Sequence, residues 1–314
     1  MRILFIDSTH PILPEQLEAA GYQCDYKPNI SYEELVATAH QYEGWVLRSK
    51  FTITDDLLKI ATSLKFIARV GAGMESIDLE AAKNRGIMCF NSPEGNRDAV
   101  GEHALGMLLT LWNKIHLANI EVKTGLWNRE ANRGLEIKGK KVGIIGFGNM
   151  GGAFAQRLKG FEAEILAYDK YKHNYAPKGV AEVTLEELKA ECDIISLHVP
   201  LTDETHHMVD ESFINDCQKP VTLINTARGP VIKTEALIEG LKQKRVLGAA
   251  LDVLEYEQSS FESLHALKDQ PLALQYLLTA NNVVITPHIA GWTQESKIKL
   301  ATVLVEKIIA HFPA

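Results

Sequence analysis

Residues 140–152 read Lys-Lys-Val-Gly-Ile-Ile-Gly-Phe-Gly-Asn-Met-Gly-Gly, and this stretch decides the fold class. The apolar run 142–145 predicts a strand, and it leads into the spacing Gly146-x-Gly148-x-x-Gly151, which is typical of a dinucleotide-binding turn. Gly146 would allow the tight turn, Gly148 would let a pyrophosphate approach the backbone, and Gly151 would let the next helix lie close to the strand. Because ordinary glycine-rich turns also show this spacing, the following segment has to decide between the two interpretations.

That segment is a second expected strand, 164–168, which ends at Asp169, 18 residues beyond Gly151. A carboxylate at this place accepts hydrogen bonds from the adenosine ribose and repels a 2′-phosphate. We therefore expect NAD as the cofactor, rather than NADP. The alternative is that Asp169 is only a turn residue before Lys170.

Composition limits the class of partner. The chain has 314 residues, enough for two domains with full cores, and it is 46% hydrophobic and 23% charged, as globular proteins usually are. A net charge of −7 argues against a broad surface for nucleic acid or for an anionic membrane. We expect a small-molecule partner.

The cysteines and the N-terminus indicate a cytoplasmic protein. Cys24, Cys89, Cys192 and Cys217 show no C-x-x-C spacing, and a reducing compartment suits free thiols. The first residues predict a strand whose apolar run is too short for a signal peptide, and no segment approaches 18 apolar residues. Zinc-site spacings are also missing, so we expect no metal.

Strands and helices alternate along the first ninety residues, which predicts a parallel α/β unit. The expected strands are 3–6, 22–26, 45–47, 64–70 and 87–90. The unit lacks a G-x-G-x-x-G, but Gly71-Ala72-Gly73 follows one of its strands, where bare backbone N–H groups could receive a carboxylate. A flexible turn without a ligand is the alternative.

A turn-rich connection at 91–97 predicts a domain junction, and the pattern then becomes helical from Asp98 to about Val122. This helix carries apolar residues on more sides than one core-facing stripe requires. Two interpretations remain open: burial between the two subunits of a homodimer, or coverage by the chain's own core.

The second unit predicts a doubly wound sheet of six strands, 142–145, 164–168, 193–199, 221–225, 246–251 and 283–286. A helix from about Thr293 to the end should pack back onto the first unit. The expected fold is therefore α/β with two Rossmann-like, doubly wound parallel-sheet domains. The cofactor domain, 98–286, would be inserted into a substrate domain formed by 1–97 and 287–314.

Three polar side chains follow strands of the second unit, at the sheet edge where ligands bind in such folds. Arg228 offers a rigid fork for a carboxylate, and His288 can exchange a proton with a hydroxyl or carbonyl oxygen. Glu257 beside the imidazole would orient it. Singly, these residues could be a surface ion pair, a helix cap and a solvated carboxylate.

Together the motifs are similar to those of the D-2-hydroxyacid dehydrogenases, and within that family to the short-form D-3-phosphoglycerate dehydrogenases. The matching segments are Asn91-Ser-Pro with Asn96, Gly101-Glu-His-Ala, Gly146 to Gly151, Asn225-Thr-Ala-Arg-Gly, Gly248-Ala-Ala-Leu-Asp-Val with Glu257, and Thr286-Pro-His. The chain departs from the family at Gln258, where proline is usual, and at Met74-Glu-Ser. These departures leave open whether Glu255 or Glu257 pairs with His288.

The resemblance implies a role for each site residue. Arg228 would bind the substrate's carboxylate and keto oxygen, His288 would be the acid/base, and Glu257 its partner. Asp252 would hold the nicotinamide end with Thr226 and Ala227. The remaining NAD contacts would come from Asn149, Met150, Pro200, Thr205 and Ala290.

The same resemblance implies oxidation of 3-phosphoglycerate to 3-phosphohydroxypyruvate, the first step of serine biosynthesis. Arg48 and Arg69 follow strands of the first unit and would bind the phosphate, and Arg129 would reach the neighbouring subunit's site. Each of the three could instead be a surface ion pair. The rival functions are a glyoxylate or hydroxypyruvate reductase and an NAD-sensing binding protein similar to the related transcriptional corepressors.

Overall fold

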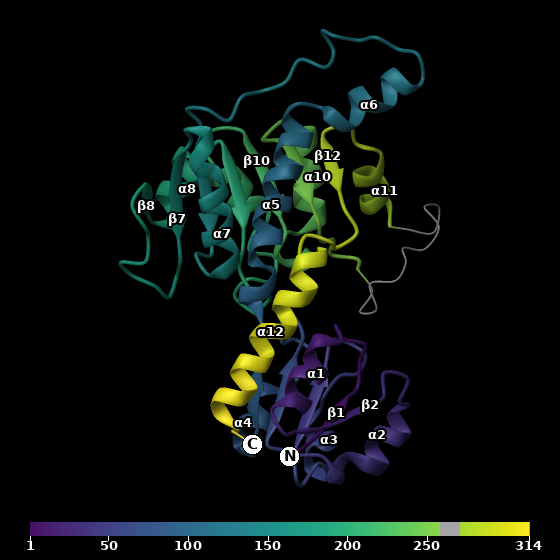
Figure 1. Ribbon diagram of the computed structural model, residues 1–314. Helices are drawn as coiled ribbons and strands as arrows, with labels where there is room; N and C mark the ends of the chain where they lie inside the picture. Colours follow the sequence, from purple (N-terminus) through teal and green to yellow (C-terminus); the bar gives the residue numbers. More distant parts are fainter. Residues whose placement is uncertain (258–270, 314) are drawn as a thin grey trace. The chain divides into compact units, whose positions relative to one another are not determined.

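The computed structural model describes residues 1–257 and 271–313, and it divides into two compact units (Figure 1). Unit 1 comprises Met1–Arg97 with Trp292–Ala314, and unit 2 is the uninterrupted stretch Asp98–Gly291. The chain returns to unit 1 after Gly291, whereas we expected the return after residue 286. The difference arises because residues 286–290 are bonded to Asp252 of unit 2.

Unit 1 contains a parallel five-stranded sheet in the order β2-β1-β3-β4-β5. Its strands are β1 (Arg2–Phe5), β2 (Gln23–Tyr26), β3 (Gly44–Leu47), β4 (Phe66–Arg69) and β5 (Met88–Phe90). The order reverses between β1 and β3, and ligands bind at the carboxyl ends of the strands beside such a reversal. The five expected strands are confirmed.

Helices cover both faces of this sheet. They are α1 (Ile12–Ala19), α2 (Tyr32–Thr38), α3 (Asp55–Ile60), α4 (Leu79–Asn84) and the C-terminal α12 (Gln294–His311). Leu304 and Ile308 of α12 are fully buried in one cluster with Ile3, Phe5 and Leu17. The expected packing of the last helix onto the first unit is therefore confirmed.

Helix α5 (Pro93–Trp112) begins inside the segment that we expected to be a turn. Proline suits a helix start because its fixed φ is helical and the missing N–H would have no partner there. Gly95 does not interrupt this helix either. A Cβ on it would lie 2.5 Å from the backbone nitrogen of Leu300, so the glycine lets α12 approach the first turn of α5.

Unit 2 contains a parallel seven-stranded sheet in the order β12-β11-β10-β9-β6-β7-β8. Its strands are β6 (Lys141–Ile145), β7 (Glu164–Tyr168), β8 (Val180–Glu182), β9 (Ile194–Leu197), β10 (Val221–Asn225), β11 (Val246–Leu251) and β12 (Val283–Ile285). The six expected strands are present, and the edge strand β8 adds a seventh. Two of the three residues of β8 are exposed and the strand ends in Glu182, so no apolar run in the sequence marks it.

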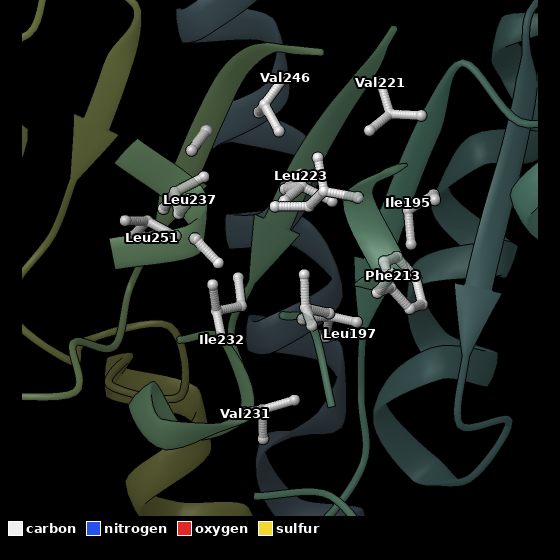
Figure 2. Close-up of a cluster of buried hydrophobic side chains, with 14 of the residues drawn as sticks. Ile195, Leu197, Phe213, Val221, Leu223, Val231, Ile232, Leu237, Val246 and Leu251 are labelled. Atoms are coloured by element: carbon white, nitrogen blue, oxygen red, sulfur yellow. The ribbon is translucent and has the colours of Figure 1, made fainter. Parts of the chain in front are cut away.

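Each face of this sheet has its own core. Figure 2 shows part of one, in which Leu223 and Leu251 of the strands lie near Leu237 of α10 (Thr234–Lys242). The other helices of unit 2 are α6 (Ile115–Lys123), α7 (Asn149–Leu158), α8 (Leu185–Glu191), α9 (Glu211–Asp216) and α11 (Leu272–Thr279). The opposite face packs against α5 and α7 through Ala104, Leu108 and Phe154.

The expected single helix 98–122 is wrong, because the chain breaks at Lys114, whose φ of 50° is left-handed. Ala104, Leu108 and Trp112 of α5 are buried in a core of unit 2, and the indole nitrogen of Trp112 donates to Thr222 Oγ1 at 3.0 Å. By contrast α6 has no buried residue, and it extends with the following segment away from the sheet (Figure 1). The apolar side chains that exceed one core-facing stripe are therefore the exposed ones of α6, and not those of α5.

The four cysteines are free, as expected. Burial raises the pKa of Cys24 and Cys192 to about 12, and that of Cys89 and Cys217 to about 11. These thiols are therefore protonated at neutral pH and unreactive. Among the described residues, no helix combines the length and apolarity that a membrane span requires.

Candidate active site

The glycine turn of unit 2 joins β6 to α7 at the point where the strand order reverses. Gly146 has a φ of 90°, and a Cβ on Gly151 would lie 2.1 Å from the carbonyl oxygen of Gly146. Gly148 is the N-cap of α7 and supplies no side-chain cap, so the first N–H groups of the helix point outward. Backbone N–H groups and the helix dipole make such a start suitable for a pyrophosphate.

Asp169, at the end of β7, braces this turn. Its Oδ2 accepts a hydrogen bond from the backbone nitrogen of Phe147 at 3.0 Å, and Oδ1 accepts one from Tyr171 at 3.1 Å. Lys172 Nζ donates to the Phe147 carbonyl at 2.8 Å and lies 3.9 Å from the Asp169 carboxylate. The sequence did not single out Lys172, which the structure brings to the turn.

The loop after β9 carries Pro200 and Thr205. The Thr205 hydroxyl donates to the Pro200 carbonyl at 2.6 Å, so the two expected cofactor residues hold one compact turn. His198 begins this loop, and desolvation lowers its pKa to about 3. It is therefore neutral at physiological pH and does not compete with His288 as a proton carrier.

The loop after β10 holds Arg228 through its own backbone. Asn225 is the anchor, since its Oδ1 accepts from Ala227 N and its Nδ2 donates to the Arg228 carbonyl, both at 3.0 Å. The Arg228 guanidinium donates to the Ala227 carbonyl at 2.6 Å. Within the described residues, the buried Thr226 hydroxyl has no hydrogen-bond partner, which fits a residue that contacts a ligand.

Asp252, which follows β11, fixes the loop that carries His288. Its side chain is 1% exposed, and its two oxygens accept bonds from Thr286 Oγ1 (2.6 Å), Ile289 N (2.9 Å) and Ala290 N (2.8 Å). Burial raises the pKa of Asp252, but the bonds from His103, Thr286 and the two backbone N–H groups outweigh it and hold this pKa below its ordinary value. The sequence did not predict this bracing role.

His288 and Glu257 form the pair that the sequence suggested. His288 Nδ1 lies 2.8 Å from Glu257 Oε2, and the other carboxylate oxygen accepts from Leu254 N at 2.5 Å. His288 has a left-handed φ of 55°, and its N–H donates to the Asp252 carbonyl at 2.8 Å. The choice between Glu255 and Glu257 is resolved in favour of Glu257, because Glu255 pairs with His207 at 2.6 Å.

The arginines of unit 1 lie at the carboxyl ends of neighbouring strands, since Leu47 of β3 pairs with Arg69 of β4. Arg48 follows β3, and its guanidinium lies 4.7 Å from the ring centroid of Trp292. The Arg69 side chain folds over Gly71, where a Cβ would lie 1.7 Å from its guanidinium nitrogen. The structure thus brings Arg48, Arg69 and the 71–73 turn to one edge of this sheet.

The segment after α6 carries Arg129, and the side chain is exposed there. It lies among the exposed apolar residues of that segment, of which Trp127 is 75% exposed.

Comparison with known proteins agrees with this geometry. The profile of the D-isomer specific 2-hydroxyacid dehydrogenase family, NAD binding domain, matches residues 105–290. The chain belongs to this family. The resemblance to the D-2-hydroxyacid dehydrogenases is therefore confirmed, and NAD is confirmed as the cofactor class.

Three proteins similar to this chain are named for three different activities. D-3-phosphoglycerate dehydrogenase of Archaeoglobus fulgidus is 35% identical over 98% of this chain, which spans 57% of that protein's length. Hydroxypyruvate reductase of Thermotoga maritima is 37% identical over 89% of this chain and 88% of its own length. A solved acyclic imino acid reductase in complex with NADPH and D-Arg superposes with a TM-score of 0.85 at 28% identity, covering 100% of this chain and 99% of its own.

The residues of unit 2 fit a bound dinucleotide. Gly148 stands open in front of an uncapped helix start, Asp169 ends the next strand, and the unpartnered Thr226 hydroxyl follows β10. These groups would hold the pyrophosphate, the ribose and the nicotinamide end. Among the described residues, no group of three or more His, Cys, Asp or Glu could hold a metal ion.

Proposed function

We propose that this chain is an NAD-dependent dehydrogenase that oxidises a D-2-hydroxy acid at C2, with 3-phosphoglycerate as its substrate. The observation that carries the proposal is the 2.8 Å pair between His288 and Glu257 on a loop braced by Asp252. The pair suits proton transfer, because the carboxylate orients the imidazole and stabilises its charged form. The pair therefore supports an enzyme over a corepressor-like NAD sensor.

The proposed chemistry divides between Arg228 and His288. Bound NAD supplies nicotinamide C4 as the hydride acceptor. Arg228 binds the substrate carboxylate with its planar fork, which orients C2. As the C2–H bond breaks and its electron pair leaves as hydride, His288 takes the hydroxyl proton and a C2=O bond forms.

Glu257 has two tasks in this step. Because Nδ1 of His288 faces Glu257, Nε2 is the nitrogen that would exchange the proton with the substrate. The carboxylate also stabilises the imidazolium that forms during oxidation. In the reductive direction the same His288 returns the proton to the keto oxygen.

The phosphate assignment rests on the cations of unit 1. Arg48 and Arg69 share one edge of the sheet with the Gly71–Gly73 turn. We propose that unit 1 binds substrate and unit 2 binds NAD. Oxidation of 3-phosphoglycerate would place the protein at the first step of serine biosynthesis, in the cytoplasm, where its four free thiols stay reduced.

A steady-state assay of NAD reduction tests the proposal across a panel of D-2-hydroxy acids. The panel contains 3-phospho-D-glycerate, D-glycerate and D-lactate, with NADH oxidation by hydroxypyruvate and glyoxylate in the reverse direction. We expect the highest kcat/KM for the phosphorylated acid. Failure of the wild type to reduce NAD with any acid, while NADH still binds, would favour the NAD-sensing alternative.

Hydroxypyruvate reductase is the second candidate. It is favoured by the Thermotoga maritima relative, to which this chain is 37% identical over 89% of its residues. If D-glycerate and hydroxypyruvate give higher kcat/KM than the phosphorylated acid, this candidate takes first place. His288, Glu257 and Arg228 would keep their roles.

We also propose a homodimer built on α6. Ile115, Ile120, Val122 and Trp127 are all more than half exposed, and a gathering of exposed apolar side chains on one segment is typical of a subunit interface. Arg129 belongs to the same exposed segment and would reach the partner's site. Light scattering should give twice the 34.9 kDa chain mass at micromolar concentration, and a 34.9 kDa particle would contradict the proposal.

A further inference from the structure

One short segment after β11 carries two carboxylates, and each meets a histidine from a distant part of unit 2. Glu257 meets His288, and Glu255 meets His207, whose Nε2 lies 2.6 Å from Glu255 Oε1. The first pair is the proposed proton carrier. The second pair has no part in the reaction as proposed above.

His207 is held in an unfavourable backbone conformation. Its φ of 54° lies in the left-handed region, which non-glycine residues adopt rarely and at a cost in energy. The backbone N–H of His207 donates to the Pro230 carbonyl at 2.7 Å, two residues beyond Arg228 in the next loop. The surrounding structure therefore fixes both the backbone and the ring of His207.

Glu255 also supplies the missing cap of a helix. Helix α10 begins after Lys233, which provides no side-chain cap, and Glu255 Oε2 accepts from the backbone nitrogen of Thr234 at 2.9 Å. Burial raises the pKa of Glu255, but the bonds from Thr234 and His207 outweigh it and hold this pKa below its ordinary value. The carboxylate is therefore ionised at neutral pH and bonded through both oxygens.

These bonds tie together the loops that follow three neighbouring strands. Val209, just after His207, exchanges backbone bonds with Val231 and Lys233 at 3.0 Å, which joins the loop after β9 to the loop after β10. Gly229 lies so near the segment after β11 that a Cβ on it would be 2.0 Å from the Leu254 carbonyl oxygen. Arg228 and Glu257 therefore extend from loops that share the Glu255–His207 pair.

We propose that Glu255 and His207 form a positioning pair that sets the place of Glu257 and Arg228 relative to each other. The inference rests on the proposed reaction at Arg228, Glu257 and His288, but it does not depend on which D-2-hydroxy acid is the substrate. Neither residue of the pair acts on substrate directly. Loss of either one lets the Glu255 segment shift, and a shift of about 1 Å at a reacting group can lower a rate by up to about a hundredfold.

The test compares four single variants of this chain with the double variant His207→Gly/Glu255→Ala. His207→Gly removes the imidazole and keeps a residue that adopts the left-handed backbone without strain. Glu255→Ala removes both bonds, and Glu255→Gln keeps an acceptor for Thr234 while it loses the charge. His206→Ala is the matched control, because this neighbouring imidazole is exposed, its ring centroid lies 4.0 Å from that of His207, and the bond to Glu255 comes from His207.

We expect His207→Gly and Glu255→Ala each to lower kcat about ten- to hundredfold, with the KM for NAD changed less than threefold. The double variant should be no worse than either single one, because both remove the same pair. Glu255→Gln should fall between wild type and Glu255→Ala, and His206→Ala should match wild type. The acidic side of the pH–rate profile should move in Glu255→Ala, although Glu255 does not contact His288.

Other outcomes overturn the inference. Normal kcat in both single variants, additive losses in the double variant, or an unchanged pH profile would each show that the pair has only a structural role. If Glu255→Ala does not fold, Glu255→Gln decides the question, since it preserves the cap of α10. A wild type inactive on every acid of the panel would remove the proposed function together with this inference, whereas an active wild type with unaffected variants removes the inference alone.

Discussion

The two glycine turns of this chain follow parallel strands in similar sheets, yet they offer a ligand different groups. In unit 2, Gly148 leads directly into α7, and the helix start has no side-chain cap. In unit 1, helix α4 begins well after Gly73 and is capped by Asp78, whose Oδ1 accepts from Ala81 N at 2.9 Å. Only unit 2 therefore presents helix N–H groups to a pyrophosphate.

The unit 1 turn is instead held by hydrogen bonds to other residues of unit 1. Gly71 N donates to Ser92 Oγ at 3.3 Å, and Asn91 Nδ2 donates to the Ala72 carbonyl at 2.6 Å. What this edge adds is positive charge from Arg48 and Arg69. The same strand–turn–helix connection can therefore serve two purposes. It can present backbone N–H groups to a dinucleotide, or it can hold cationic side chains that suit a small anion.

The largest expected effect tests whether the chemistry belongs to unit 2. His288→Asn should lower kcat by about a hundredfold or more, because the hydroxyl proton loses its acceptor. NADH binding, measured by fluorescence titration, should stay normal, since His288 holds no part of the glycine turn. A variant with near-normal kcat would move the proton transfer elsewhere.

Asp252→Asn should weaken the unit 2 loop that carries His288. The loss of two charge-assisted acceptors should reduce the free energy of unfolding by about 2–4 kcal/mol at pH 7. Because the pKa of Asp252 lies below the ordinary value of about 3.9, the carboxylate stabilises the fold above about pH 4 and loses this effect as the pH falls through its folded pKa. Urea titrations should therefore show that the difference in free energy of unfolding between Asp252→Asn and wild type becomes smaller below about pH 4.

The matched control is Thr286→Val, which removes one donor to Asp252 and leaves its charge. It should cost only about 1 kcal/mol. If the difference in free energy of unfolding between Asp252→Asn and wild type does not change with pH, the ionised state assigned to this carboxylate is wrong.

Arg48→Ala and Arg69→Ala test the cationic turn of unit 1. Each should raise the KM for 3-phosphoglycerate about tenfold, the loss of a charge-assisted contact of roughly 1.5–3 kcal/mol, and should spare the KM for D-glycerate. Lys50→Ala is the control, because Lys50 Nζ bonds to the carbonyls of Pro28 and Ile30. Equal losses on both acids would mean that the arginines bind the carboxylate or support the fold.

Asp169→Asn should relax the cofactor preference of unit 2. The amide can still accept from Phe147 N, but the charge that repels a 2′-phosphate is gone, so the ratio of kcat/KM for NAD over NADP should fall about tenfold. Lys172→Met removes the cation 3.9 Å from the same carboxylate and should move the ratio the other way. An unchanged ratio in both variants would separate Asp169 from cofactor choice.

The smallest expected effect concerns Glu257→Gln. The imidazolium of His288 loses its carboxylate, so the acidic side of the pH–rate profile should move to lower pH while kcat falls only severalfold. Stopped-flow measurement of NADH formation across the pH range would show it. A profile that superposes on the wild-type profile would remove Glu257 from the proton transfer.

Local patterns in the sequence predicted most of the fold. The strands ending at Ile145 and Tyr168 were predicted from apolar runs. These features depend on residues a few positions apart. The start of α5 at Pro93 was missed because its neighbour α12 comes two hundred residues later in the chain, where Gly95 meets Leu300.

The sequence predicted the polar residues that follow the strands, but it did not predict the hydrogen bonds that hold their loops in place. Arg228, His288 and Asp169 follow strands that a single sequence reveals. The bonds from Asp252 to Ile289 and from Glu255 to His207 join residues 37 and 48 positions apart. Such contacts arise only when the parallel strands bring their loops together, so no spacing in one sequence predicts them.

The four tryptophans divide into two buried and two exposed indoles. Trp45 and Trp112 are 0% and 6% exposed, whereas Trp127 on the segment after α6 and Trp292 beside Arg48 are 75% and 56% exposed. The buried pair should emit at shorter wavelength and resist quenching by acrylamide. Trp127 can therefore report self-association, and Trp292 can report an anion that draws the Arg48 guanidinium off its ring, without any added label.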